Sequence, residues 1–297
     1  MQKKVRLMVH TILFPSSYFD GQKIDEDIQN EYEAALDTGL WDVVLFSYDK
    51  WFHDGRLVLS KEIPSPVTAV YRGWMMKEEQ YASFYRKLQE KGITLVTDPK
   101  SYWYFHYFPH VYDAIRKDTP KMLAVPLGTE YSLTDLQEKF DRFMVKDYVK
   151  SVKGTAFPKY FTKDTTEEDF RKAMELFYQY RGELLSGGLC FKEYVDLARY
   201  GETTNEYRVF YIGNEIASVV RNSLQGNFTA EPPGSLLEKY RSLPSPFYTL
   251  DYAELADGSW KVLEAGDGSV SGPSEGQNLY AFYRAVYHCL NHRLLDN

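Results

Sequence analysis

The sequence predicts an α+β protein in which an N-terminal α/β segment precedes two α+β lobes. Three observations point to this class. Short apolar runs alternate with helical patterns through the first third of the chain, which is typical of a parallel or mixed sheet covered by helices. Proline and glycine punctuate residues 117–128 and suggest a boundary there. From Cys190 onward the chain consists mostly of short β-prone runs separated by turn residues.

The first third supplies the elements of the α/β segment. Apolar runs predict strands, and apolar residues at helical spacing predict helices. In chain order the predicted strands are residues 5–9, 42–46, 67–71 and 94–97, and the predicted helices are residues 25–36 and 78–90. Gly39 and Gly92 end the two helices, and Pro99 ends the last strand. We therefore place one domain at residues 1–118 and a second at residues 119–297.

The second domain begins with a strand at residues 142–145 and a helix at residues 167–181. Thr165 and Glu168 have the spacing of a capping box at the start of that helix. Strands and hairpins follow, and a helix at residues 278–295 closes the chain. These elements form the two α+β lobes.

Composition narrows the range of functions. Acidic residues outnumber basic ones by 42 to 35, giving a formal net charge of −7, so a nucleic-acid partner is disfavoured. No apolar run approaches the roughly 18–20 residues of a membrane span, and no secretory signal is expected at the N-terminus. The two cysteines, Cys190 and Cys289, are too few for a disulfide framework, which fits the cytoplasm. The sequence does not indicate an oligomeric state.

The most informative stretch is the hairpin at residues 247–268. A two-residue turn at Asp257-Gly258 would set Asp251 opposite Glu264, with their Cβ atoms about 5 Å apart. Half-buried, both acids stay ionised only with a cation between them. Two carboxylates suit Mg²⁺ or Mn²⁺, usually shared with a phosphate. The alternative is a solvated sheet edge at which two acids happen to meet.

A second hairpin turns at Gly213-Asn214. The same reasoning sets Glu206 opposite Arg221 and makes Arg208 and Arg221 diagonal neighbours on one face. Two guanidinium groups on a rigid strand pair are suited to clamping a phosphate or a carboxylate. The alternative is a surface Glu–Arg pair without function.

Two lysines follow the strand predicted at residues 142–145. Lys146 ends the strand and Lys150 comes just after it, so both could reach phosphate groups. A lysine at a strand end is otherwise an ordinary solvated charge.

Taken in order, these segments resemble the ATP-grasp superfamily. The resemblance rests on residues 143–154 (FMVKDYVKSVKG), residues 191–196 (FKEYVD), residues 205–210 (NEYRVF) with Arg221, and residues 250–251 (LD) with residues 262–266 (VLEAG). Residues 71–74 (YRGW) and 102–106 (YWYFH) are similar to the α/β domain that precedes the nucleotide-binding lobes in poorly characterised bacterial and phage members. With that domain the resemblance covers most of the chain.

The resemblance implies a fold in which two α+β lobes hold ATP between them, with residues 151–154 as a loop over the phosphates. The implied site residues are Lys146 and Lys150 for the phosphates, Glu193, Tyr194 and Val195 for adenine with Asp196 nearby, Arg208 and Arg221 as catalytic residues at the γ-phosphate and the acyl phosphate, and Asp251 and Glu264 for the metal. In this arrangement the basic residues and the metal oppose the negative charge of the phosphates.

One position departs from the family pattern. Members commonly carry Asn two residues after the metal-binding Glu264, whereas this chain has Gly266. Either the neighbouring Asp267 is expected to reach the metal, or a water fills the gap. From the first domain, Arg72 is expected to bind the carboxylate or another anionic part of the acceptor. The alternative for Arg72 is a structural surface arginine.

The activity that the resemblance implies is that of an ATP-dependent carboxylate–amine ligase. ATP and Mg²⁺ (or Mn²⁺) would be its cofactors, an acyl phosphate its intermediate, and a small-molecule or peptide carboxylate and an amine its substrates. The alternative is a catalytically reduced ATP-binding protein of the same fold with a regulatory or interaction role, which Gly266 favours. A third possibility is modification of a nucleic-acid end or a protein terminus by the same chemistry, and the acidic net charge argues mildly against nucleic acid.

Overall fold

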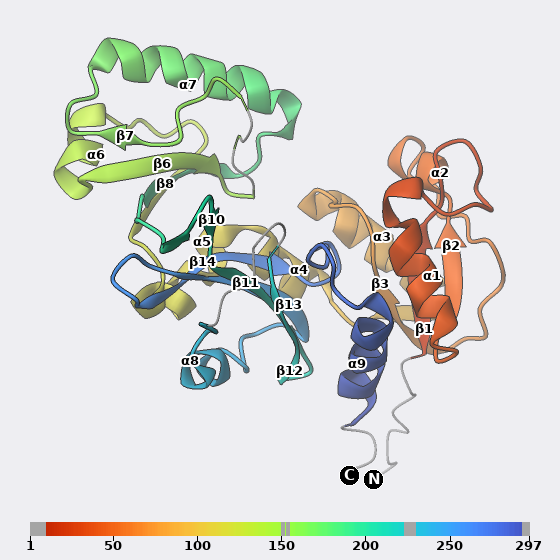
Figure 1. The fold of residues 1–297 in the computed structure, drawn as a ribbon. Helices are drawn as coiled ribbons and strands as arrows, with labels where there is room; N and C mark the ends of the chain where they lie inside the picture. The colour runs from red at the N-terminus through yellow and green to blue at the C-terminus, as the bar shows by residue number, and fades with distance from the viewer. Residues whose placement is uncertain (1–9, 150–151, 153–154, 223–229, 293–297) are drawn as a thin grey trace, which may run out of the picture.

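The computed structural model describes residues 10–149, 152, 155–222 and 230–292. Its N-terminal domain, on the right in Figure 1, is a parallel sheet of strand order β2-β1-β3-β4 covered by helices. The elements are β1 (Thr11–Pro15), α1 (Gln29–Asp37), β2 (Asp42–Phe46), α2 (Tyr48–Phe52), β3 (Val67–Tyr71), α3 (Glu78–Glu90), β4 (Ile93–Leu95), α4 (Pro99–His106) and α5 (Phe108–Ile115). The predicted α/β segment is therefore confirmed.

The structure confirms β2, β3 and α3 at the predicted residues, and β4 within a residue or two of the prediction. The strand predicted at residues 5–9 lies outside the described residues. Strand β1, which the sequence analysis did not predict, pairs with both β2 and β3 and is buried along its whole length. The helix predicted at residues 25–36 is divided, because a 3₁₀ turn at Glu26–Ile28, capped by Asp25, precedes α1.

The next lobe, at the upper left of Figure 1, is an antiparallel sheet of order β5-β8-β6-β7 covered on one face by α6 and α7. Its elements are β5 (Met122–Pro126), α6 (Leu133–Lys139), β6 (Arg142–Asp147), β7 (Phe161–Thr162), α7 (Glu167–Arg181) and β8 (Gly188–Glu193). Helix α7 is capped by Thr166, whose side chain accepts a hydrogen bond from the amide of Asp169. The capping box predicted from Thr165 and Glu168 is therefore wrong by one residue.

Strands β6 and β8 have two chemically different faces. Phe143, Val145, Leu189 and Phe191 are buried against α6 and α7. Lys146, Cys190 and Lys192 alternate with them and turn toward the last lobe. Since these two lysines are 1% and 3% exposed, the face presents buried positive charge, which needs partners.

The last lobe is the antiparallel sheet β12-β11-β13-β14 in the centre of Figure 1. Its elements, with the small β9–β10 pair, are β9 (Arg199–Tyr200), β10 (Thr203–Thr204), β11 (Glu206–Ile212), β12 (Glu215–Arg221), α8 (Gly234–Lys239), β13 (Phe247–Glu254) and β14 (Trp260–Asp267). Side chains of α4 and α5 pack on one face of this sheet, against Tyr248 and Leu250. The other face is left for polar residues.

The closing helix α9 (Leu279–His292) lies against the N-terminal domain. Phe282 and Tyr283 share a core with Phe14 of β1 and with Phe210 of β11. This helix therefore joins the first and last parts of the chain. The division at residue 118 stays a prediction. Among the described residues, no helix has the length and apolarity needed to span a membrane.

Candidate active site between the two lobes

The hairpin β13–β14 brings the two predicted metal ligands together. Asp251 is directly opposite Glu264, as predicted. The turn itself differs from the prediction, because Leu255 N donates to Ser259 O and three residues form the loop, with Gly258 at φ +81°. A bulge at Leu263 then restores the register at the acidic pair.

The hairpin β11–β12 corrects the prediction for Arg221. A bulge at Ala217 shifts the register, so that Arg208 lies opposite Val220 and Arg221 lies opposite Tyr207. Partners across an antiparallel pair point to the same face and neighbours along a strand to opposite faces. Arg221 is thus turned away from Arg208, with its guanidinium carbon 5.7 Å from the centre of the Tyr207 ring.

The acidic pair is bound by cations from both lobes. Arg208 Nε and Nη2 donate to the two carboxylate oxygens of Asp251, at 2.8 and 2.7 Å. Lys146 Nζ, from the facing lobe, lies 2.5 Å from Glu264 Oε2. Strand register places Arg208 directly opposite Asp251, since β13 is paired with β11 on one side and with β14 on the other.

A third cation, Lys192, belongs to the same cluster and was not given a role by the sequence analysis. Its ammonium donates to the carbonyl of Leu263, the extra residue of the bulge. It also lies 4.2 Å from the centre of the Phe108 ring, while Lys146 Nζ lies 5.1 Å from the same ring. A lysine two residues from Cys190 in an otherwise apolar strand is the signal that could have identified it.

Burial and charge act on the two lysines differently. Burial lowers the pKa of Lys192 to about 8, although Glu264 opposes the shift and Lys146 adds to it. For Lys146, burial also favours the neutral form, but the adjacent Glu264 carboxylate outweighs burial and raises the pKa. The site therefore holds one firmly charged lysine and one whose charge is easily lost.

We define the charged cluster as Lys146, Lys192, Arg208, Asp251 and Glu264. It contains three basic and two acidic side chains, contributed by two separate sheets. Its excess positive charge and its position between the lobes suit a polyanionic ligand such as a triphosphate.

The residues expected to hold a nucleobase lie at the end of β8 and just after it. Glu193 Oε2 accepts the amide of Lys121 at 3.0 Å. The ring of Tyr194 lies 4.4 Å from that of Tyr160, measured between centroids. Val195 is half-buried, and Asp196 forms an ion pair with Arg142. The side chains of Glu193 and Asp196 are therefore engaged in the absence of ligand, and both are accessible to solvent.

The predicted lysine Lys150 and most of the predicted phosphate loop, residues 151, 153 and 154, lie outside the described residues. Asp147, next to Lys146, is fully buried and pairs with Arg181 of α7 at 2.5 Å. This pair anchors the end of β6, and with it the position of Lys146.

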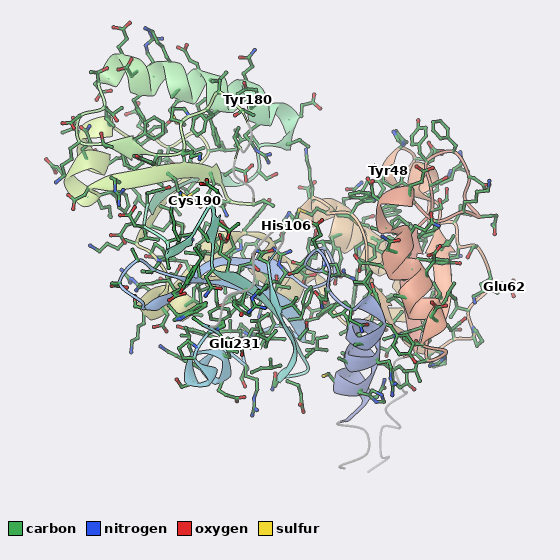
Figure 2. All side chains as sticks on the ribbon, viewed as in Figure 1. Tyr48, Glu62, His106, Tyr180, Cys190 and Glu231 are labelled. Atoms are coloured by element: carbon green, nitrogen blue, oxygen red, sulfur yellow. The ribbon has the colours of Figure 1, made fainter. Side chains whose placement is uncertain are left out.

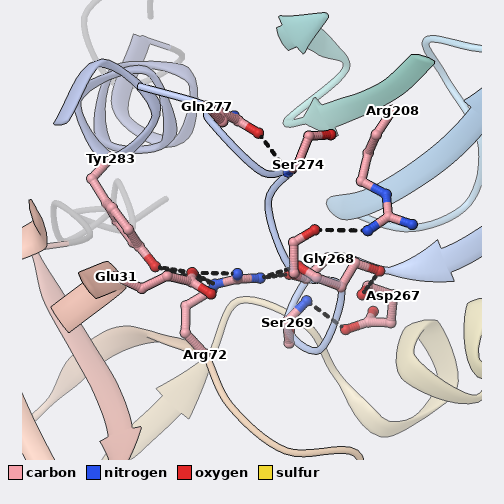
Figure 3. Close-up of polar contacts among 11 residues, drawn as sticks. Glu31, Arg72, Arg208, Asp267, Gly268, Ser269, Ser274, Gln277 and Tyr283 are labelled. Carbon is pink, nitrogen blue, oxygen red and sulfur yellow. Dashed lines mark hydrogen bonds and ion pairs between the residues drawn. The ribbon is translucent and has the colours of Figure 1, made fainter. Parts of the chain in front are cut away.

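Arg72 does not lie free to bind an anionic substrate group, as was expected. It is 2% exposed, and its Nη2 lies 2.5 Å from Glu31 Oε2. Figure 3 shows the same guanidinium reaching the loop after β14, where it donates to the carbonyls of Gly268 and Ser271. Tyr283 of α9 donates to the same Glu31 oxygen. The prediction for Arg72 is corrected to a buried clamp between the domains.

Asp267 is also placed away from the other two acids. It follows Glu264 by three residues on β14 and pairs with Tyr248, so its side chain points to the opposite face of the sheet. Its Oδ1 accepts the amide of Ser269 at 2.9 Å, and its Oδ2 has no hydrogen-bond partner within the described part of the chain. Burial raises the pKa of Asp267 to about 7. Strand alternation therefore excludes the expected third metal ligand.

The donor set fits a divalent ion held by two carboxylates. Asp251 and Glu264 are hard oxygen ligands on one face, and each is already paired with a cation, so the site is built to balance two negative charges. Within the described residues, no group of three or more His, Cys, Asp or Glu side chains could hold a metal. A bound ion would have to complete its shell with other oxygens, such as phosphate and water.

The position of Gly266 leaves no room for the family's asparagine. A Cβ there would lie 2.7 Å from Ser271 Oγ and 3.2 Å from Thr249 Oγ1. These two hydroxyls are hydrogen-bonded to each other at 3.0 Å. Ser271 Oγ also donates to the carbonyl of Asp267 at 2.8 Å.

Gly266→Asn is therefore expected to lower the free energy of unfolding by about 1–3 kcal/mol, as overpacking does in buried sites. Urea unfolding measures it. Gly266→Asn combined with Ser271→Gly removes the nearest contact and should recover part of the loss. Full stability in the single variant would contradict the crowding argument.

Comparisons with known proteins place the fold. Residues 136–286, just over half of the chain, match a family model described as an ATP-grasp domain, family 3 of one clade of these domains. No curated protein is significantly similar in sequence. Among solved structures, the D-alanine–D-alanine ligase from Bacillus anthracis complexed with ATP has a TM-score of 0.62 at 11% identity, covering 98% of this chain and 99% of that one.

Two other solved structures are similar over nearly their whole length. The D-cycloserine synthetase DcsG has a TM-score of 0.58 at 16% identity, with 94% of this chain and 99% of that chain covered. The ATP-grasp ligase PsnB, complexed with a phosphomimetic variant of its minimal precursor, Mg and ADP, has a TM-score of 0.59 at 12% identity, with 95% and 99% covered. At these identities the likeness shows a shared fold. Together with the family match, it shows that the chain belongs to the ATP-grasp superfamily, in the family whose model it matches.

Proposed function

We propose that the protein is an ATP-dependent ligase that joins a carboxylate to an amine through an acyl phosphate. The observation that carries this proposal is the charged cluster between the lobes, in a chain of the ATP-grasp superfamily. Three of its members were predicted from the sequence as phosphate and metal ligands, namely Lys146, Asp251 and Glu264. The fourth, Arg208, was predicted as catalytic.

Each basic residue of the cluster would oppose charge on the nucleotide. Lys146 and Lys192 approach from the sheet of one lobe and Arg208 from the other, so a triphosphate between them would be contacted on two sides. Asp251 and Glu264 would hold Mg²⁺, which neutralises phosphate charge when bound. Because Lys146 and Arg208 are paired with these carboxylates, they are positioned for phosphate oxygens before a ligand arrives.

The reaction has two balanced steps. An oxygen of the substrate carboxylate attacks the γ-phosphorus, the bond to the β-γ bridging oxygen breaks, and ADP leaves. The amine nitrogen then attacks the acyl carbon, the C–N bond forms, the bond to the phosphate oxygen breaks, and inorganic phosphate and a proton are released. Arg208 is placed to stabilise charge on the transferred group, because its Nη1 is held by the carbonyl of Gly272 at 2.8 Å.

Several neighbouring structures support the choice of ligands. Their descriptions include ATP, or ADP with Mg, and a precursor peptide. By the same analogy we assign Glu193, Tyr194 and Val195 to the adenine, Asp196 to the ribose and Lys150 to the phosphates. A cytoplasmic setting fits a reaction that consumes ATP.

A second candidate function is ATP binding without ligation. The observation that favours it is the metal site, which has two carboxylates, with Gly266 in place of the family's asparagine and no room for a side chain there. A weaker metal site would leave nucleotide binding intact while slowing phosphoryl transfer.

The test is ADP release from ATP, measured in a coupled assay with excess Mg²⁺ and with mixtures of carboxylic acids and amines. We expect release that needs the acid and is abolished by EDTA, because the carboxylate is the phosphoryl acceptor. Binding of ATP is measured in parallel by calorimetry. Tight binding with no release under any acceptor would favour the second function, and no binding would exclude both.

A further inference from the structure

A cavity of about 880 Å³ opens between the N-terminal domain and the loop that follows β14. Phe14, Tyr48, Phe52 and Trp74 form an aromatic wall, and Val270 and Gly272 line the side nearest the last lobe. This volume is several times that of a single small amino acid and lies within the usual range for organic ligands.

The cavity lies beside the charged cluster. Gly272 lines the cavity, and its carbonyl accepts a hydrogen bond from Arg208 Nη1. On the other side of the same loop, Arg72 donates to the carbonyl of Ser271 (Figure 3). A Cβ at Gly272 would meet nothing within 4 Å, so the space in front of this residue is open. A molecule in the cavity would therefore be one loop away from the proposed site of phosphoryl transfer.

The charges around the cavity favour a cation. Asp27 and Glu79 line it with exposed carboxylates, and neither makes an ion pair within the described part of the chain. Arg72 also lines it, but Glu31 neutralises this guanidinium at 2.5 Å. Among the described lining residues Lys77 is the other cation. A carboxylate would meet net repulsion here, whereas an ammonium group would find two acceptors.

The aromatic wall continues onto the surface of the N-terminal domain. Tyr48 and Phe52 are stacked with their ring centroids 4.4 Å apart. Tyr18 lies 6.4 Å from Tyr48, and its neighbour Phe19 is 94% exposed. Aromatic faces bind apolar bodies and also attract cations. The ligand is thus expected to combine a positive charge with an aromatic or bulky apolar group.

We propose that this cavity binds the amine substrate, and that this substrate is a primary amine carried on an aromatic or bulky apolar body, such as the N-terminal residue of a peptide. The assignment as substrate rests on the proposed ligase function, whereas binding of the amine does not. Phe14, Tyr48, Phe52 and Trp74 hold the apolar body, and Asp27 and Glu79 hold the ammonium group.

The experiment measures binding of three probes of nearly equal size by calorimetry without ATP. Phenylalanyl-glycinamide carries a free amine, its N-acetyl form is neutral, and N-acetyl-phenylalanyl-glycine carries a carboxylate. The expected order of affinity is cation, neutral, anion. Equal or tighter binding of the anion, or no binding of the amine at millimolar concentration, would overturn the proposal.

Two variants separate charge from packing. Asp27→Asn with Glu79→Gln should weaken the amine probe about fivefold to tenfold and leave the neutral probe unchanged, since it removes two surface charges. Phe52→Leu should weaken all three probes by a similar factor. Glu62→Gln is the matched control, because Glu62 is an exposed acid at the outer edge of the same domain and does not line the cavity (Figure 2). An unchanged amine affinity in the double variant would refute the charge assignment.

The two proposals fail separately. If ATP is turned over but the amine probe does not bind, the ligase function stands and the amine pocket is wrong. If the amine probe binds with the expected charge dependence and no ATP turnover is found, the pocket stands as a binding site and the ligase function is wrong.

Discussion

Glu264→Gln is expected to lower magnesium-dependent ATP turnover about a hundredfold or more while the protein remains folded. Glu264 faces Asp251 on the neighbouring strand and is paired with Lys146 of the other lobe. Loss of its negative charge weakens the proposed hold on the metal, and about 3 kcal/mol of transition-state stabilisation corresponds to that change in rate. Steady-state ADP release, with thermal unfolding as the check on the fold, measures the effect.

The stability of this variant needs its own control. Lys146 is 1% exposed, and removal of its partner leaves a buried cation uncompensated. Lys146→Met combined with Glu264→Gln removes both charges, so it should unfold at a higher temperature than the single variant and still be inactive. Glu175→Gln breaks an exposed ion pair with Arg171 on α7 and should leave turnover unchanged. Near-native turnover in folded Glu264→Gln would remove the metal assignment.

The parts of the fold that the sequence predicted well are those determined by local patterns. Strands β2 and β3 and helices α3 and α7 have the predicted bounds. Each has a strong apolar periodicity and clear end signals, so neighbouring residues are enough to define it. The pairing of Asp251 with Glu264 was also found, although the turn that led to it has three residues and not two.

The errors at the site come from features without a local signal. The bulges at Leu263 and Ala217 each change which residues face one another, and only the packing of whole strands determines where they occur. The first bulge offset the error in the turn and left the acidic pair in place. The second turned Arg221 to the opposite face, so the predicted pair of arginines does not form.

Long-range partners were also out of reach of the sequence. Glu31 precedes Arg72 by 41 residues, and no spacing or motif connects them, yet their ion pair decides that Arg72 is a clamp. Lys192 was inside a quoted motif, but its role depends on Lys146, Glu264 and Phe108 from other elements. Such contacts follow from tertiary packing, which a single sequence does not encode in any readable pattern.

Asp267→Asn is expected to stabilise the protein at pH 8 by up to about 4 kcal/mol, with the gain disappearing near pH 4. In the folded protein burial raises the pKa of Asp267 from 3.8 to about 7. Between these values the folded state keeps a proton that the unfolded state releases, so stability falls as the pH rises from about 4 to 7. Above pH 7 the wild type carries a buried charge that the amide lacks. Urea unfolding from pH 4 to pH 8 measures the difference.

The control for this prediction lies at the other end of the same hairpin and has the opposite sign. The pKa of Asp257 is lowered by hydrogen bonds from Ser259. Its ionised form therefore stabilises the folded state above about pH 4, and this stabilisation is lost as the pH falls through the folded pKa. Asp257→Asn should be less stable than the wild type at pH 8, and the two should converge in acid. If Asp267→Asn were destabilising at pH 8 and equal to the wild type at pH 4, Asp267 would be ionised in the folded protein with a favourable partner.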